Sequence, residues 1–152
     1  MSKKVEVKEK VKEELWCEAL KNGNIMRYRA LGGSMSPFIK GGSILTVDPK
    51  RKISIGDVIL CKNGDGLIAH RVIRKRKKGL IFITKGDNIG CPDNPVGMSE
   101  LFGKVVRVEG KRDVDMNSLS SRLFNYAIAV ASLLFLSKAL FILRRIKYMV
   151  HK

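Results

Sequence analysis

Apolar side chains recur at helical spacing near the start of the chain. Leu15 and Ala19 lie four residues apart, and Asn22-Gly23 follows them. This spacing predicts an amphipathic helix, and a glycine just after the repeat is a common helix end. We therefore predict a helix over residues 1–24 whose apolar face packs on the domain that follows.

Beyond residue 24 the pattern changes to short apolar runs separated by turns. Asn63-Gly-Asp-Gly66 has the composition of a hairpin turn, and Gly103 interrupts the last run in the manner of a bulge. Short strands with frequent turns are typical of a mainly β fold, either an antiparallel sheet or an irregular barrel. We predict this fold for residues 25–115. The predicted strands cover residues 25–30, 43–47, 57–61, 67–73, 80–84 and 101–108, with a basic turn over 74–79.

The last part of the chain is almost uniformly apolar. Between Arg122 and Arg144 lie 21 residues whose only charged side chain is Lys138. A helix of this length spans roughly 30 Å, which is enough to cross a bilayer core. We predict a hydrophobic helix over residues 122–145 that serves as a membrane anchor, followed by a basic tail over 146–152. An interfacial helix and a soluble packing helix are the alternatives.

The charge of the chain is strongly positive and points to an anionic partner. Thirty Lys and Arg against 14 Asp and Glu give a net charge of +16 over 152 residues. Nucleic acid and a negative membrane surface both attract such a protein. The basic run Arg74–Lys78 has no interleaved aromatic residue and no recognition helix beside it. We therefore expect no nucleic acid partner, and predict membrane lipid as a partner and the membrane as the location.

The cysteines do not form a recognisable metal or disulfide pattern. Cys17, Cys61 and Cys91 are widely spaced, without a CxxC pair, and the chain has only two histidines. We expect free thiols and no metal site. The sequence also lacks a phosphate-binding loop of the Walker type and a dinucleotide fingerprint, so no cofactor is expected.

Catalytic chemistry is suggested by a serine that follows two glycines. In Gly32-Gly-Ser-Met-Ser-Pro37 the glycines let a backbone approach closely, and they leave amides free to face an oxyanion. Serine becomes a useful nucleophile only with a base nearby. His70 lies on a predicted strand, whereas His151 lies in the basic tail and is expected to be idle. An aspartate in the loop Thr84-Lys-Gly-Asp-Asn88, or shortly after it, would orient such an imidazole.

These motifs occur in an order that resembles a known family. GGSMSP, a Gly-Asp-Val strand, Ala-His-Arg-Val and Thr-Lys-Gly-Asp-Asn, with Asp93 after it, are similar to the membrane-bound type I signal peptidases. The resemblance is to the branch of archaea and the eukaryotic secretory membrane, which uses a histidine base. It covers residues 30–109 and implies a β-rich fold with a long coiled antiparallel sheet.

The resemblance also implies roles for individual residues. Ser34 would be the nucleophile, His70 its general base, and Asp93 the carboxylate that orients the imidazole. Asp87 would be a supporting acidic residue or a second candidate for that last role. The oxyanion and substrate site would be formed by Gly33, Ser34 and Met35, with the Ser34 N–H as a donor.

Three departures from the family pattern affect the predicted specificity more than the triad. No apolar helix precedes the serine motif. Gly32 stands where some family members have a hydroxyl residue. The family's GDNN motif is Gly-Asp-Asn-Ile89 here, and its DD pair is Pro92-Asp93.

We predict a membrane-associated serine endopeptidase that cleaves signal peptides from exported proteins, with a preprotein or peptide as substrate. A self-cleaving relative of the repressor type and a non-catalytic basic β-module tethered to a membrane are the alternatives. Oligomeric state and the side of the membrane are left open.

Overall fold

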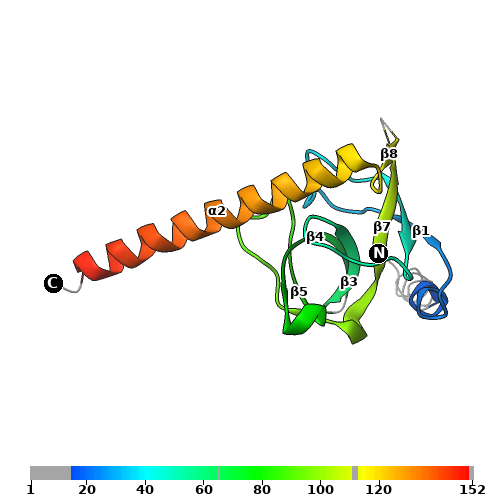
Figure 1. The fold of residues 1–152 in the computed structure, drawn as a ribbon, viewed down its shortest axis with the longest axis horizontal. Helices are drawn as coiled ribbons and strands as arrows, with labels where there is room; N and C mark the ends of the chain where they lie inside the picture. The colour runs from blue at the N-terminus through cyan, green and yellow to red at the C-terminus, as the bar shows by residue number, and fades with distance from the viewer. Residues whose placement is uncertain (1–14, 65, 111–112, 151–152) are drawn as a thin grey trace, which may run out of the picture.

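A single antiparallel sheet with a helix on either side forms the body of the protein (Figure 1). The computed structural model describes residues 15–64, 66–110 and 113–150, with side chains up to residue 135. Within these residues the sheet has eight strands: seven follow the order β1-β2-β7-β3-β4-β5-β6, and β8 lies off this path, paired with β7. The sheet is not closed, so the predicted mainly β fold is confirmed in its coiled-sheet form rather than as a barrel.

Six strands lie close to the predicted positions, and the described residues add two short strands and two 3-10 turns. Their bounds are β1 Met26–Arg29, β2 Ile44–Asp48, β3 Val58–Asn63, β4 Gly66–Arg76, η1 Lys77–Gly79, β5 Ile81–Lys85, β6 Val96–Gly97, η2 Met98–Glu100, β7 Leu101–Glu109 and β8 Val114–Asp115. The two-residue strands β6 and β8 were not predicted, because two residues carry no periodic signal.

The core has two parts because the central strand β3 is buried on both faces. Val58 and Leu60 pack into one apolar cluster with Leu45 and Val105, whereas Cys61 belongs to a second cluster. Successive side chains of a strand point to opposite faces, so β3 contributes to both clusters. The same alternation in β4 decides which of its side chains reach the candidate site.

One predicted turn is a strand in the structure. The sequence predicted a basic turn over residues 74–79, but β4 continues to Arg76 and only η1 turns. A register shift between Val72 and Arg74 precedes the extension, after which Lys75 pairs with Phe82 of β5. Pairing with β5 satisfies backbone groups that a turn would leave to water, which overrides the turn-like composition.

Gly103 lies at a bulge, as predicted. The pairing of β3 with β7 shifts register between Leu60 and Cys61, opposite Gly103. Gly103 has a φ of +157°, and a Cβ there would lie 2.9 Å from the Val47 side chain and 3.0 Å from the Asp48 backbone. Only glycine allows β7 to approach β2 so closely.

The N-terminal helix is confirmed for the residues that the structure describes. Residues 15–21 are helical and Gly23, with φ +83°, follows them; residues 1–14 lie outside the described part. Leu20 is buried in the core and Trp16 stacks edge-on against Tyr28. Leu15 was expected on the apolar face but is 60% exposed, because the helix turns it away from the sheet.

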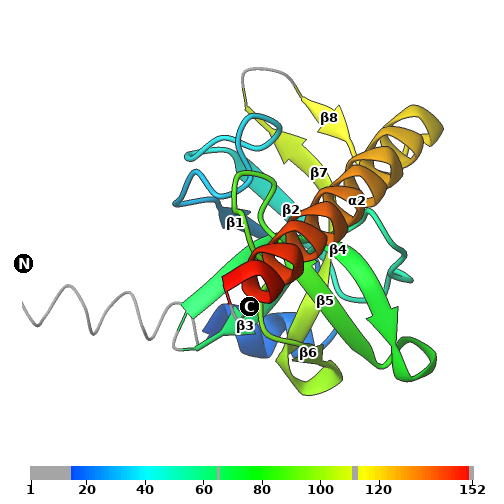
Figure 2. The ribbon, with the colours of Figure 1, turned by 90° about the vertical axis from the view of Figure 1, so that its left-hand side faces the viewer.

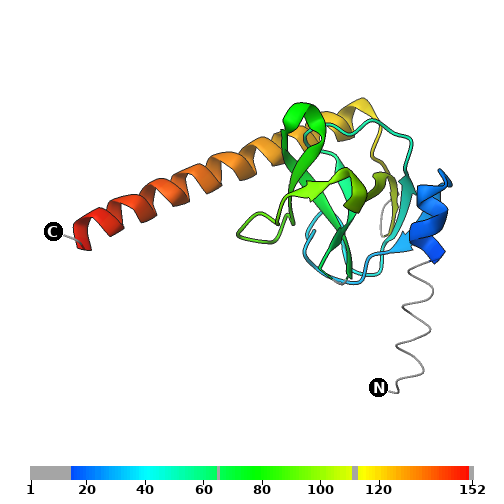
Figure 3. The same ribbon diagram turned by 90° about the horizontal axis from the view of Figure 1, so that it is seen from below.

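The C-terminal helix α2, Leu119–Val150, begins on the sheet and extends beyond it (Figures 1 and 3). Seen nearly along its axis, α2 crosses over β4 (Figure 2). Asn125 and Ala129 are buried at this contact. The predicted basic tail over 146–152 is helical as far as Val150, and residues 151 and 152 lie outside the described part.

The predicted membrane span over residues 122–145 is not supported. No helix in the described part of the chain is long and apolar enough to cross a membrane. The first turns of α2 instead place the polar Asn125 and the small Ala129 against the β domain.

Candidate active site

Ser34 lies in a tight turn that leaves β1 and leads back to β2. The Ser36 N–H donates to the Gly33 carbonyl over 3.0 Å, and the Ile39 N–H donates to the Met35 carbonyl over 2.9 Å. The side chains of Met35 and Ile39 are buried in the core beneath this turn. The buried pair anchors the turn, and Ser34 is held at its surface facing β4.

His70 of β4 connects Ser34 to a carboxylate. Its Nε2 lies 2.9 Å from the Ser34 Oγ, and its Nδ1 lies 2.6 Å from the Asp93 Oδ2. A carboxylate beside Nδ1 favours the tautomer in which Nδ1 carries the hydrogen, so Nε2 is left to accept the hydroxyl proton. The structure therefore brings Ser34, His70 and Asp93 together in the order that a serine nucleophile requires.

Asp93 is fixed by the end of β5. The Thr84 hydroxyl donates to the Asp93 Oδ2 over 2.8 Å, and the Asp93 N–H donates to the Thr84 carbonyl over 2.8 Å. Thr84 is fully buried. Two hydrogen bonds to this one buried residue position both the backbone and the carboxylate of Asp93, which in turn orients the imidazole.

The segment between β5 and Asp93 closes over the serine. The Asn88 N–H donates to the Ser34 carbonyl over 2.8 Å. A Cβ at Gly86 would lie 2.8 Å from that carbonyl oxygen and 3.1 Å from the His70 Nε2. Glycine is therefore required at position 86, because any side chain there would displace the serine or the histidine.

Asp87, the other predicted acidic residue, lies away from His70 and binds Arg71. The Arg71 Nε and Nη2 donate to the two Asp87 carboxylate oxygens, each over 2.7 Å, and both side chains are buried. This bidentate ion pair uses both carboxylate oxygens. Asp87 thus pairs with Arg71, which fits the supporting role offered for it, whereas Asp93 is the carboxylate beside His70.

The backbone around the serine has amides that no described partner uses. Among the hydrogen bonds of the described residues, none involves the N–H of Ser34 or of Met35. A Cβ at Gly33 would meet nothing within 4 Å, so the space beside this backbone is open. These groups suit the oxyanion role predicted for Gly33, Ser34 and Met35, which stays a prediction.

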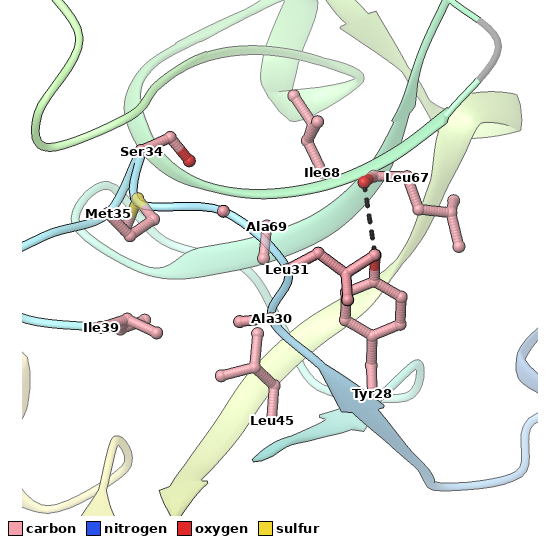
Figure 4. A pocket seen from close by; sticks show the side chains of 11 residues that line it. Tyr28, Ala30, Leu31, Ser34, Met35, Ile39, Leu45, Leu67, Ile68 and Ala69 are labelled. Carbon is pink, nitrogen blue, oxygen red and sulfur yellow. Dashed lines mark hydrogen bonds between the residues drawn. The ribbon is translucent and has the colours of Figure 1, made fainter. Parts of the chain in front are cut away.

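A small apolar pocket of about 170 Å³ adjoins Ser34 (Figure 4). Ala30 and Gly32 line it on one side, and residues 67–69 of β4 line it on the other. Residues 66–70 of β4 pair with β3, and within the described chain they have no strand on their other edge. The pocket therefore lies between a short loop and a strand edge that has no neighbouring strand, where the Tyr28 hydroxyl donates to the Leu67 carbonyl over 3.5 Å (Figure 4).

A comparison with protein families identifies the fold family of the chain. A family model described as Peptidase S24-like matches residues 3–106. The chain belongs to the Peptidase S24-like family. The S24-like chain therefore has a serine-peptidase-like fold, which confirms the broad part of the sequence resemblance. A search of curated proteins gives no significant match.

The cysteines of this S24-like protein lie outside the Ser34–His70–Asp93 contacts. Cys61 is buried, and its burial, followed by the nearby Asp93 and Glu100 carboxylates, raises the pKa of its thiol to about 12. Cys91 is exposed on the loop that leads to Asp93. Within the described residues, no three His, Cys, Asp or Glu side chains are grouped so as to hold a metal ion.

Several residues that build the S24-like site were missed by the sequence interpretation. Thr84 and Gly86 lie in the quoted TKGDN motif, so their position was available but their contacts were not. Arg71 stands beside His70 in the quoted Ala-His-Arg-Val motif, but the motif gives no indication of its partners Asp87, Gly56 and Asn125. Asn125 gave no local signal, because it lies 54 residues from its partner Arg71.

Proposed function

We propose that the protein is a serine endopeptidase of the signal peptidase type, acting near a membrane on peptide segments with small residues before the cleaved bond. The observation that carries the proposal is the continuous contact from Asp93 through His70 to Ser34, next to the pocket. The family match supports a peptidase fold, and the sequence motifs favour the histidine-based branch.

The geometry supports an acyl-enzyme mechanism. The Ser34 Oγ attacks the peptide carbonyl carbon while its proton moves to the His70 Nε2, and the Ser34 N–H faces the oxyanion. The carbon–nitrogen bond then breaks as His70 returns that proton to the leaving amine. Water next attacks the ester, gives a proton to His70, and releases the acid as Ser34 recovers its hydrogen. Asp93 stabilises the imidazolium in both steps.

The pocket supports a preference for small side chains. Its walls include Ala30 and Ala69, with Leu45 and Ile39 below (Figure 4). A cavity of about 170 Å³ accommodates one or two small apolar groups, and a large aromatic side chain would need the buried Met35 to move. An extended substrate beside β4 would place such a residue next to Ser34.

Exposed apolar side chains near the site support action at a lipid surface. Leu31 is 84% exposed, and the half-exposed rings of Phe38 and Phe124 pack edge-on with centroids 5.3 Å apart. Apolar groups clustered on a basic protein favour an anionic interface. We expect the protein to sediment with vesicles that contain anionic lipid, and to sediment less with neutral vesicles. Absence of binding to both kinds of vesicle would contradict this part of the proposal.

The deciding experiment is cleavage of a peptide with small residues before the cut, measured with detergent or lipid. Wild type should cleave, Ser34→Ala should not, and Ser36→Ala provides a matched control in the same turn. Equal activity of wild type and Ser34→Ala would assign the cleavage to a contaminant. No cleavage by wild type in lipid would reject the proposed substrate class.

Self-cleavage is a second candidate, favoured by the S24-like match. Mass spectrometry of the purified chain distinguishes it. A shortened form that is present in wild type and absent from Ser34→Ala would show intramolecular cleavage. A full-length wild-type chain that cleaves added peptide would favour the proposed endopeptidase.

A further inference from the structure

The C-terminal helix contacts the catalytic domain through a buried polar group. The Asn125 Oδ1 accepts a hydrogen bond from the Arg71 Nη1 over 2.8 Å, and Asn125 is 6% exposed. A buried amide placed against a guanidinium is costly unless the contact is made. The position of α2 is therefore tied to the position of Arg71.

Arg71 carries this contact to the loop beside the serine. Its Nη1 also donates to the Gly56 carbonyl over 2.9 Å, while its Nε and Nη2 hold both oxygens of Asp87. Every nitrogen of the guanidinium is used, so Arg71 cannot move without breaking a bond to one of three separate segments. These segments are the turn at Gly56, helix α2 and the loop at Asp87.

Asp87 lies between the two residues of this loop that contact the catalytic pair. Gly86 packs directly on the Ser34 carbonyl and the His70 Nε2, and Asn88 donates to the Ser34 carbonyl. A shift of Asp87 therefore moves both neighbours. The chain of contacts runs from α2 to the Ser34 backbone without crossing solvent.

The helix is also seated by direct backbone contact. A Cβ at Gly56, where φ is +93°, would lie 2.7 Å from the Tyr126 nitrogen and 2.9 Å from the Asn125 carbonyl carbon. These are backbone atoms that cannot swing aside. The fit leaves α2 only one close position on the turn that Arg71 also binds.

We infer that α2 is a positioning element of the active site, and that Asn125 is a positioning residue that acts through Arg71 and Asp87. It does not touch the reacting atoms. It keeps Gly86 and Asn88 against Ser34 and His70, so that the Oγ to Nε2 geometry is formed before substrate arrives. The kinetic part of this inference rests on the proposed peptidase function; the geometric part does not.

The test compares two substitutions of similar size. Asn125→Leu removes the acceptor, whereas Asn125→Asp keeps an oxygen that Arg71 can bind. We expect Asn125→Leu to lower kcat by about 10-fold or more with KM changed less than about 3-fold, since small displacements of reacting groups are costly. Asn125→Asp should restore most of kcat.

A second readout does not depend on activity. The chain has two histidines, so nitrogen-labelled His70 is distinguished from His151 by a His151→Gln control. The proton on the His70 Nδ1, held by Asp93, should give a far-downfield NMR signal. We expect this signal to shift or broaden in Asn125→Leu and to return in Asn125→Asp.

The two readouts separate the possible failures. Wild-type kcat and an unchanged His70 signal in a folded Asn125→Leu protein would overturn the inference. If wild type cleaves no peptide, the proposed function fails, and the His70 signal alone decides the inference.

A second pair of variants covers failure of Asn125→Leu to fold. Gly56→Ala forces α2 off its seat, while Gly79→Ala imposes a similar strain at φ +90°, where the added atom meets only the flexible end of Lys75, 3.3 Å away. We expect the His70 signal to change in Gly56→Ala and not in Gly79→Ala. Equal behaviour of the two variants would overturn the inference.

Discussion

His70 and Arg71 are consecutive residues of β4, and each faces an aspartate, but the two pairs differ in their other contacts. His70 has Asp93 on one side and the hydroxyl of Ser34 on the other. Arg71 has Asp87, the Gly56 carbonyl and Asn125 around it. The His70–Asp93 pair contacts a hydroxyl that can give up a proton, whereas every nitrogen of the Arg71 guanidinium is already hydrogen-bonded.

Strand β4 thus carries a candidate catalytic residue, His70, on one face and a structural ion-pair residue, Arg71, on the other. Adjacent side chains of a strand leave it on opposite faces, so the two aspartates of one loop are drawn to different faces of β4. An imidazole changes charge near neutral pH, whereas a guanidinium stays charged. The same kind of carboxylate therefore orients a base on one face and completes a permanent ion pair on the other.

The largest effect should come from removing the imidazole. We predict that His70→Ala lowers kcat/KM by at least about 10³-fold, because the Ser34 proton then has no acceptor. Its melting temperature should also fall, because the variant leaves a cavity at a buried position and removes a partner of the Asp93 carboxylate. Peptide kinetics with a thermal melt measure both quantities. Retained cleavage would remove His70 from the mechanism.

The two aspartates provide the sharpest contrast. Asp93→Asn should lower kcat by about 10³- to 10⁴-fold, because an amide favours the wrong imidazole tautomer. Asp87→Asn should lower it far less per unit of folded protein. The measurement is kcat corrected for the folded fraction. Equal losses in the two variants would contradict the division between His70 and Arg71.

The free energy of unfolding should fall more in Asp87→Asn than in Asp93→Asn, which is the reverse of the order expected for kcat. Asp87→Asn leaves the buried Arg71 charge without its carboxylate, and loss of one member of a buried pair costs about 3–5 kcal/mol in the free energy of unfolding. Asp93→Asn should cost less, because Thr84 and a neutral imidazole can still bond to an amide. Denaturant melts test this order, and a more stable Asp87→Asn would reverse our interpretation.

Acidification should lower activity before it unfolds the protein. A histidine acts as a base only as the neutral imidazole, and a protonated imidazole cannot accept the serine proton. The expected profile of kcat/KM falls on the acid side, with circular dichroism unchanged over the same range. A profile that is flat from about pH 5 to pH 8 would argue against a histidine base.

The smallest effect concerns the buried thiol of Cys61 and the exposed thiol of Cys91. With its pKa raised to about 12, the buried Cys61 has a thiolate fraction of roughly 10⁻⁴ at pH 8 and should resist maleimide. The exposed Cys91 should react within minutes. Mass spectrometry of native and denatured samples counts the labels, with Cys91→Ser as the control. Rapid labelling of native Cys61 would contradict its burial.

The sequence predicted most of the sheet because its strands carry local signals. Glycine-rich turns and β-branched runs placed six strands within a few residues, and Gly103 indicated its bulge. The errors occurred where distant partners decided the outcome. Lys75 belongs to β4 because Phe82 pairs with it, and the start of α2 lies on the domain because Asn125 finds Arg71.

The sequence by itself determined the chemical types at the site: a serine in a glycine-rich turn, one histidine on a strand, and two aspartates in one loop. Only the tertiary structure decided which aspartate faces which side chain. Asp87 and Asp93 are six residues apart, and local patterns cannot tell them apart. Thr84, buried at the end of β5, holds Asp93 beside His70. Arg71, held in turn by α2, draws Asp87 to the other face.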